Sequence, residues 1–412
     1  MLTRKQLSYV AVCFIPIHEL GKLFILCFLV VPALQSGQMM KTDDLVLMSL
    51  SVKSARAFNL PDDDEEKSVR LKLAGDLALG LYFKMSKKTD LEQAIAAYEA
   101  AEKLLPDGHP WQAGLYGQLG GAFAICFKYS GDLVDIDKAI FYHEQSVHFI
   151  GDNHAHKHIH LNDLGMALVF RYRHCRDLVD INKAISAHEQ AADLTPDGNV
   201  KKPGHLYDLG KSFALRFIHC KDLVDINKAI SIYEQAVDLT PDDYVTRPGH
   251  LCDLGIYLNL RFQHCGEPVD IDKAISIHQQ AVQLTPDGHV HEGFYLHELG
   301  AAVFQRYMHA GNLADMDMAI SVQEQAVHLT PNSDARKSTF LDGPGNSFKK
   351  YFEHSKDPTY IEKAIAAYEQ AVHLTLDGQA SKPHHLGHLG ISFMCYFEQS
   401  KNLFISIRPS LF

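Results

Sequence analysis

The chain has little positive charge and lacks the short motifs that usually mark an enzyme. Its 412 residues include 39 Lys and Arg against 50 Asp and Glu, a formal net charge of −11. A nucleic-acid binder needs a basic face, and a single-strand binder also needs aromatic residues interleaved with basic ones. Neither pattern is present, and no phosphate-binding loop, Gly-x-Gly-x-x-Gly or Gly-x-Ser-x-Gly motif occurs. We therefore expect neither nucleic acid as a partner nor enzymatic activity.

Cysteine is sparse and is not arranged in pairs. None of the eight cysteines forms a Cys-x-x-Cys motif, and the chain has no Asn-x-Ser/Thr glycosylation site. Cys175, Cys220 and Cys265 follow one another at steps of 45 residues. If these steps are stacked repeats, the cysteines lie ~8–10 Å apart, beyond the reach of a disulfide bond. These features favour a reducing, cytoplasmic location.

What the chain does contain is a repeat of 45 residues. One column of the repeat is glycine: Gly75, Gly120, Gly165, Gly210, Gly255, Gly300, Gly345 and Gly390. A second column is alanine: Ala94, Ala139, Ala184, Ala229, Ala274, Ala319 and Ala364. A fixed period of this length is typical of a solenoid or a propeller. A repeat array also explains how so long a chain forms a core, because each unit packs only on its neighbours.

The pattern inside one unit predicts two helices. In the unit from Gly204 to Tyr244, the first apolar stripe has helical spacing: Leu206, Leu209, Gly210, Phe213 and Phe217. Asp222 then supplies a helix N-cap, and Pro241 ends the second helix. The second stripe is also helical: Ile226, Ala229, Ile230, Tyr233, Ala236 and Val237. Because no segment alternates with period two, the propeller is excluded and an all-α fold is predicted.

The glycine column indicates a close contact between helices. Glycine inside a helix costs ~1 kcal/mol relative to alanine, so eight repeats of that cost need a reason. The simplest reason is a crossing with no room for a Cβ atom. A larger residue at Gly210 is then expected to overpack, at a cost of ~1–3 kcal/mol.

The motif within each unit resembles the tetratricopeptide (TPR) repeat. Ala229, Tyr233, Ala236 and Pro241 are spaced like the second half of that motif, and Leu209-Gly210 with Phe213 looks like the first half. The unit is longer than the TPR of about 34 residues. Its long form is similar to the TPR arrays of CHAT-domain proteins, over roughly Asp62 to Asn402. The resemblance implies a right-handed α-solenoid of tandem antiparallel helix pairs.

The repeat pattern also sets the expected boundaries. We expect an apolar N-terminal segment at 1–41, a worn half-repeat and acidic linker at 42–66, the solenoid at 67–400 and a truncated final repeat at 401–412. Within the array, Pro344 replaces the Leu that precedes the column glycine, and Leu376 replaces the terminal Pro. The final unit ends before a second helix, so the chain either ends abruptly or is a fragment of a longer product.

The apolar stretch near the N-terminus has three interpretations. It is a degenerate repeat, a targeting segment or a poor membrane span. Glu19, Lys22 and two prolines count against the span. A secretory or membrane-anchored location through residues 7–34 is thus the alternative to the cytoplasm.

Three polar columns recur in the first helices. They are an arginine column (Arg171, Arg216, Arg261, Arg306), an acidic column (Asp163, Asp208, Asp253, Glu298) and a histidine column (His174, His219, His264, His309, His354). The arginines could form a ladder for an acidic ligand. We favour a repeated structural ion pair or hydrogen bond, because a residue present in every unit most simply serves the packing that every unit shares.

Other first-helix positions vary from unit to unit. Residues 207, 211, 214 and 218 share a face beside the apolar stripe, and the resemblance places this face in a concave groove. Its mixed apolar and polar character suits a peptide-binding groove. The candidate residues are Asn162, Met166, Arg173, Tyr207, Lys211, Ile256, Asn259, Gln263, His297, Phe304 and Met308. The alternative is drift on an exposed surface.

Histidine clusters are the remaining candidates for chemistry. His154-x-His156-x-His158-x-His160 and His384-His385-x-x-His388 are rich in metal ligands, but no Cys or acidic residue stands at a telling spacing. A solvated His-rich loop is the favoured interpretation. We expect no metal, no cofactor and no catalytic residue.

The sequence thus predicts a protein–protein interaction scaffold that binds a peptide or protein in the groove of a TPR-like superhelix. The alternative is the sensor arm of a larger CHAT-type, caspase-like protease whose catalytic domain is absent from this chain. A fold alone does not decide between them.

Overall fold

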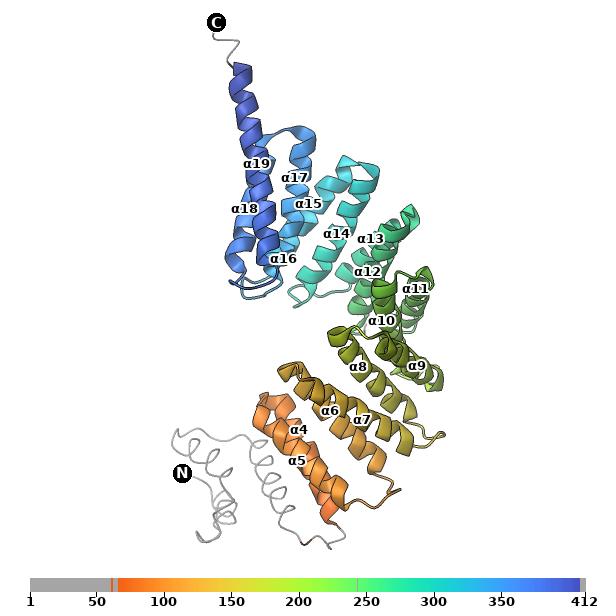
Figure 1. The fold of residues 1–412 in the computed structure, drawn as a ribbon. Coiled ribbons are helices and arrows are strands. Elements are labelled where there is room, and N and C mark those ends of the chain that lie inside the picture. Colours follow the sequence, from red (N-terminus) through yellow and green to blue (C-terminus); the bar gives the residue numbers. More distant parts are fainter. Residues whose placement is uncertain (1–60, 62–65, 243, 408–412) are drawn as a thin grey trace, which may run out of the picture. The chain divides into compact units, whose positions relative to one another are not determined.

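The computed structural model describes residues 61, 66–242 and 244–407, with side chains up to residue 399 (Figure 1). Every regular element in these ranges is a helix. The expectations for the segments 1–41 and 42–66 lie almost wholly outside the described residues. Among the described helices, none has the length and apolarity that crossing a membrane requires. The predicted all-α fold is confirmed.

The chain divides into two compact units, residues 1–180 and 181–412. The first contains α4 (Lys67–Met85), α5 (Lys88–Leu104), α6 (Gln112–Ser130), α7 (Leu133–Phe149) and α8 (Lys157–Cys175). Helix α9 (Leu178–Leu194) crosses the division. The second contains α10 (Lys202–Cys220), α11 (Leu223–Asp238), α12 (Arg247–Cys265), α13 (Pro268–Gln283), α14 (Glu292–Ala310), α15 (Leu313–Leu329), α16 (Lys337–Phe340), α17 (Asp342–Ser355), α18 (Pro358–Leu374) and α19 (Lys382–Ile407). Each pair is antiparallel and packs on the next pair of its unit.

Each pair is joined by a very short connection whose conformation repeats. In the pair α10–α11, Lys221 adopts the left-handed conformation at φ 59° and donates its backbone N–H to the carbonyl of Phe217. The Asp222 side chain then accepts the N–H of Val224 at 2.9 Å. The predicted N-cap of the second helix is therefore confirmed, and it stabilises the helix by satisfying an otherwise unpaired N–H group.

A break distinguishes the first helix of the unit that contains Pro344. The helix is divided into α16 and α17 at Leu341. Proline has no N–H to donate to the carbonyl of Phe340 and its ring crowds that carbonyl, so the helix cannot continue undisturbed. The substitution of Pro344 for leucine thus places Asp342 in the first turn of α17.

The glycine column marks a contact between the two helices of a pair. A Cβ atom on Gly210 would lie 2.9 Å from the ring of Tyr233, which belongs to the second helix. The same approach, under 3.0 Å, is made at Gly75, Gly120, Gly255, Gly300 and Gly345. The atoms that exclude the Cβ belong to a side chain of the second helix. The expected close contact is confirmed at these six positions, whereas Gly390 has no such neighbour within 4 Å.

The arginine column is a structural ion pair. Arg216 donates Nε and Nη2 to the two carboxylate oxygens of Asp225 at 2.8 and 2.6 Å. It also donates Nη1 to Asn182 Oδ1 of the preceding second helix at 2.7 Å. The same forked pair joins Arg171 to Asp180, Arg261 to Asp270 and Arg306 to Asp315. Each arginine thus ties three helices together, and the interpretation as a structural column is confirmed.

The histidine column also contributes to packing between successive 45-residue repeats. The ring of His264 meets the ring of Phe217, on the preceding first helix, edge to face with centroids 5.5 Å apart. His309 meets Phe262 in the same way at 5.3 Å. Such edge-to-face contacts suit the quadrupoles of the two rings.

The glycine contact predicts opposite effects at two positions of the same column. Gly210→Ala is expected to destabilise the chain by about 1–3 kcal/mol, because the new methyl group would overlap the Tyr233 ring. Gly390→Ala is the matched control, and it is expected to be neutral or to stabilise by up to about 1 kcal/mol through helix propensity. Urea denaturation of both variants measures the difference. Equal effects at the two positions would contradict the close-contact explanation.

Neutral buried histidines make the fold sensitive to acid. His278 is 1% exposed, lies under Gly255, and neither of its ring nitrogens has a hydrogen-bond partner. Burial lowers its pKa to about 4, and burial does the same at His143. The unfolded chain therefore binds these protons first as the pH falls.

The contribution of these histidines to stability is accordingly expected to be complete above pH ~6.5 and to be lost progressively as the pH falls toward 4. His278→Gln uses the amide that Gln323 provides at the equivalent position, and it removes one titrating group. The variant is expected to lose about 3 kcal/mol less than the wild type between these pH values. Denaturant unfolding at pH 7 and pH 4 tests this. An unchanged pH dependence would mean that His278 is not buried as neutral imidazole.

Candidate functional site

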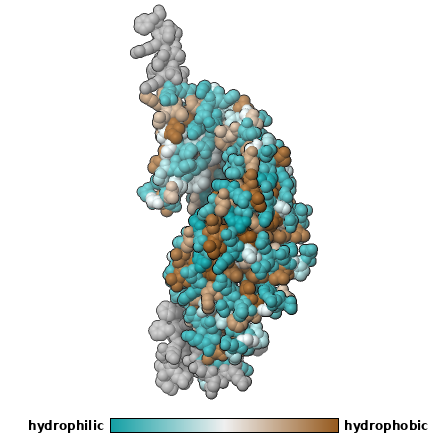
Figure 2. Space-filling view, turned by 45° about the vertical axis from the view of Figure 1, so that its right-hand side comes forward, coloured by the Kyte–Doolittle hydropathy of each residue, from teal (hydrophilic) through white to brown (hydrophobic). Residues whose placement is uncertain are grey.

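The candidate groove residues of the first helices fall into an exposed group and a half-buried group. Arg173, Gln263 and Met308 are exposed near the C-terminal ends of α8, α12 and α14. The others are half-buried: Asn162, Met166, Tyr207, Lys211, Ile256, Asn259, His297 and Phe304. Three of the residues belong to the first unit and eight to the second, so we treat the two groups separately. Figure 2 shows hydrophobic and hydrophilic residues mixed in small patches over the visible surface.

Two of the half-buried residues pack against the next first helix. The ring of Tyr207 stacks on His250 with centroids 4.8 Å apart, and its hydroxyl donates a hydrogen bond to Asp253. The ring of His297 stacks on Phe340 at 4.3 Å. The residue at position 207 of one 45-residue repeat, or its equivalent, therefore contacts the equivalents of positions 205 and 208 in the following repeat. We call this the first-helix contact.

Two carboxyl groups lie at successive first-helix contacts of the second unit. Asp253 is on α12 and Glu298 is on α14, and both are half-buried. Desolvation raises the pKa of both groups, and that of Glu298 to about 7. The charge of Asp253 raises the pKa of Glu298 further, so the two groups sense each other. Neither forms an ion pair with any basic side chain of the described part.

The two acidic groups have different neighbours. Asp253 accepts a hydrogen bond from Tyr207, and the ammonium group of Lys211 favours its charged form. At Glu298 the equivalents of Tyr207 and Lys211 are Cys252 and Ile256, which offer no cation. Burial and the two nearby acids raise the pKa of the Cys252 thiol well above its usual value, so it is no nucleophile. Glu298 is therefore the acid with least compensation.

Two further polar atoms on this face are buried without a hydrogen-bond partner. They are Oδ1 of Asn259 and Nδ1 of His297. Burial lowers the pKa of His297 to about 4, so its ring is neutral at pH 7. Buried polar atoms are almost always satisfied in folded proteins, and each exception costs about 1–3 kcal/mol. The second unit thus keeps several uncompensated polar groups beside its first helices.

Sequence reasoning placed Asp253 and Glu298 in a recurring column and interpreted that column as structural. The sequence contained one sign of a difference. Glu298 is the only glutamate in this column, and the position equivalent to Lys211 is the apolar Ile256. The sequence could not show that the arginine column is already paired with other aspartates and is not available to these acids.

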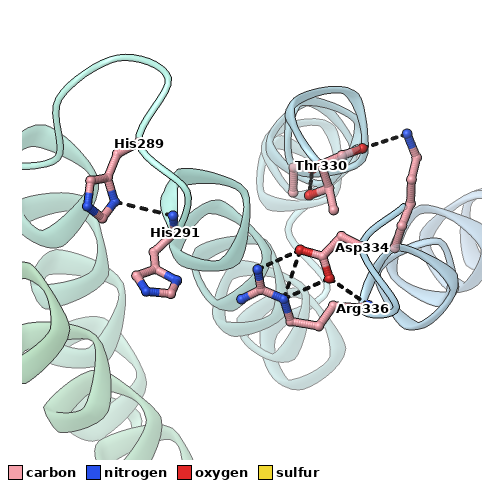
Figure 3. Close-up of polar contacts among 7 residues, drawn as sticks. His289, His291, Thr330, Asp334 and Arg336 are labelled. Carbon is pink, nitrogen blue, oxygen red and sulfur yellow. Dashed lines mark hydrogen bonds and ion pairs between the residues drawn. The ribbon is translucent and has the colours of Figure 1, made fainter. Parts of the chain in front are cut away.

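A second feature is a cavity between successive loops of the second unit. It holds about 310 Å³ and is lined by His289, Phe294, Thr330, Asp334 and Arg336, among others. Figure 3 shows His289, Thr330, Asp334 and Arg336. Arg336 Nη2 donates to Asp334 Oδ2 at 2.6 Å, and hydrogen bonds from Arg336 lower the pKa of Asp334 to about 2. Because Arg336 and Asp334 are paired with each other, their charges largely cancel, and Glu292 is a further acidic residue of the cavity lining.

The first unit has a cavity at the equivalent place. It holds about 450 Å³, and its lining residues include Trp111, Ile150, His154 and His156. His154 and His156 precede Asp334 and Arg336 by 180 residues, four steps of the 45-residue repeat. The two cavities therefore lie at equivalent positions of two repeats. His160 also lines this cavity, but its Nδ1 lies 2.6 Å from the Ser146 hydroxyl.

The His-rich loop does not gather its side chains around one point. Among the described residues, only Asp342, His384 and His385 bring three possible metal-ligand atoms within 4.8 Å of one another. His158 is 3% exposed and packs into the core. The described cysteines are all free thiols, as expected from their spacing: Cys126, Cys175, Cys220, Cys252, Cys265 and Cys395.

The uncompensated carboxyl group of Glu298 makes stability decrease as the pH rises from acidic to neutral values. The folded-state pKa of Glu298 lies above the usual 4.5, so ionising it costs more in the folded chain than in the unfolded one. The contribution of protonated Glu298 to the free energy of unfolding is therefore complete below pH ~4.5. It is lost as the pH rises through 7. Glu298→Gln is expected to stabilise the chain by up to about 3 kcal/mol at pH 8 and by little at pH 4.

Thermal or urea unfolding of this variant at the two pH values is the measurement. Asp238→Asn, an exposed acid at the end of α11, is the matched control and is expected to show no such pH-dependent gain. If Glu298→Gln destabilises the chain at pH 8, the carboxylate has a partner and the uncompensated arrangement is wrong.

Comparison with known proteins gives only remote likenesses. No family model matches this sequence, and no curated protein matches it significantly. Solved structures similar to the chain include YrrB, described as a TPR protein with an unusual peptide-binding site, at 15% identity and a TM-score of 0.38. That match covers 56% of this chain and 93% of YrrB.

Two other similar structures cover more of the chain. PilF of Pseudomonas aeruginosa matches at 15% identity and a TM-score of 0.44, over 67% of this chain and 98% of PilF. The human IFIT1 dimer with PPP-AAAA matches at 15% identity and a TM-score of 0.45, over 85% and 67%. Scores of this size carry no argument about function. The helix pairs themselves show that the described residues form a TPR-like, all-α helical-repeat protein.

Proposed function

We propose that this protein is an interaction scaffold whose second unit binds a peptide or protein segment along its first helices. A basic side chain of the partner, Lys or Arg, is recognised by Asp253 and Glu298. The observation that carries the proposal is Glu298, a desolvated acid without a cation partner, near Asp253, a second desolvated acid whose charged form Lys211 favours. Functional sites keep such costly groups because a ligand compensates them on binding.

Three features of the chain support a basic partner. The net charge of −11 attracts cationic segments over a distance. The half-buried acids interact more strongly with one correctly placed cation than with a scattered positive charge, because desolvation strengthens the interaction. The neighbouring Ile256 and the edges of Tyr257 and Leu260 offer apolar contact for the stem of a long side chain.

Some groove candidates of the sequence analysis lie outside the proposed acidic site. Residues Asn162, Met166 and Arg173 belong to the first unit and contribute a separate part of the face. The sensor-arm alternative stays a prediction of the sequence resemblance, since no observation of the described residues favours it.

Replacing Ile256 with lysine tests the proposal. Lys211 at the equivalent position of the preceding unit shows that the fold accepts lysine there. In Ile256→Lys the new ammonium group should neutralise Glu298 and occupy the place of the partner's cation. Peptides selected from a random displayed library on the wild-type chain should carry Lys or Arg, and should bind this variant at least about 10-fold more weakly, or ~1.4 kcal/mol. Fluorescence polarisation with the selected peptides measures the change.

Ile277→Lys is the matched control. Ile277 is also half-buried against the same apolar cluster, but it lies on the second helix α13. It should cost similar stability and leave peptide binding unchanged. Equal loss of binding in both variants, or selected peptides without basic residues, would contradict the proposed recognition.

A further inference from the structure

The last first-helix contact differs in chemistry from those before it. Asp342 occupies the position of Tyr207, three steps of 45 residues later. His385 and His388 of α19 occupy the positions of His250 and Asp253. Where the earlier contacts hold a ring stack, a hydrogen bond or an uncompensated acid, this one gathers a carboxylate and histidines from the next helix.

The distances within this group are short. Asp342 Oδ1 lies 2.9 Å from His385 Nδ1, and Asp342 Oδ2 lies 3.6 Å from His384 Nδ1. The side chain of His385 is 1% exposed and that of Asp342 is 15% exposed, whereas His384 is 58% exposed. The group is therefore anchored on its inner side and open to solvent on its outer side.

We propose that Asp342, His384 and His385 bind a divalent transition-metal ion of the Zn²⁺ class. Imidazole nitrogens and a carboxylate oxygen form a typical ligand set for such an ion, and Zn²⁺ accepts three protein ligands with a further open position. Ligand atoms that already lie within 4.8 Å of one another need only a small closing movement to reach bonds of ~2.0–2.2 Å. Solvent supplies the remaining ligand beside the exposed His384.

The surroundings of His384 favour this use of its Nδ1 atom. Its other ring nitrogen, Nε2, lies 3.1 Å from His388 Nε2. A proton on His384 Nε2 can be donated to His388, which leaves the lone pair on Nδ1 directed toward Asp342. Metal-binding histidines almost always donate their second ring N–H in this way, and the partner fixes the ring orientation. His388 is thus a positioning residue for the site.

Two features explain why the sequence did not favour a metal here. The histidine triplet at 384–388 lacks an acidic neighbour in sequence, and Asp342 is 42 residues away from His384. It is the packing of α19 on the preceding pair that brings the carboxylate to the imidazoles. Pro344 adds to this, because the break that it causes makes Asp342 a first-turn residue of α17, where a negative charge is favourable.

Zinc binding by the purified full chain tests the proposal. Competition between the chain and a chromophoric zinc chelator should show one Zn²⁺ bound to the wild type. His384→Asn removes an exposed ligand with little effect on packing, and His388→Gln removes the positioning partner. His388→Gln should weaken binding by roughly 10–100-fold, the usual effect of losing an outer partner. His384→Asn should weaken it by at least as much.

Two control variants separate this site from the other histidines. His373→Asn alters an exposed histidine on α18, and the double variant His154→Asn with His156→Asn alters the His-rich loop. Both should bind one Zn²⁺ with the affinity of the wild type. Thermal unfolding gives a second readout: Zn²⁺ should raise the melting temperature of the wild type and the controls, but not of His384→Asn.

Three outcomes would overturn the proposal. The first is a His384→Asn variant that binds as tightly as the wild type. The second is binding lost only in the double loop variant, which would place the ion in the other unit. The third is weak binding that no variant changes, which would mean an adventitious ion only.

Discussion

The packing of one second-helix side chain against the glycine column is the contact on which the described structure depends. Tyr233 lies so close to Gly210 that a methyl group has no room between them, and the same contact is made in five other pairs. Because the partner residue varies among tyrosine, histidine and glutamine, it is the absence of a Cβ, rather than one ring type, that recurs. Forked Arg–Asp pairs and capped connections also join the two helices of a pair.

The pairs share one design, whereas the contact between successive first helices differs in chemistry from one repeat to the next. Tyr207 meets Asp253 there, Cys252 lies near Glu298, His297 stacks on Phe340 and Asp342 meets His385. One structural position thus hosts a hydrogen bond, an uncompensated acid, an aromatic stack and a cluster of metal-ligand atoms. A repeat protein can change this position without altering the pair itself, since each unit packs only on its neighbours.

Much of the fold could be predicted from residues in one unit. The spacing of Leu206, Leu209 and Phe217 predicted a helix, and Asp222 predicted the N-cap of the helix that follows. Both signals act within a few residues. The role of Arg216 was predicted from its recurrence alone. Its partners were not, since Asp225 and Asn182 lie on two different helices and only their packing brings them together.

The sequence by itself determined the period, the helix pairs and the close contact at the glycine column. These follow from local propensity and from spacing, which a single chain displays openly. Tertiary structure alone decided which polar groups have partners. Glu298 lies near Ile256 without a cation, and Asp342 meets His384 and His385, which are 42 and 43 residues away. The physical reason is that compensation of a charge depends on the distance between groups and on their desolvation. Neither quantity can be read directly from the order of residues.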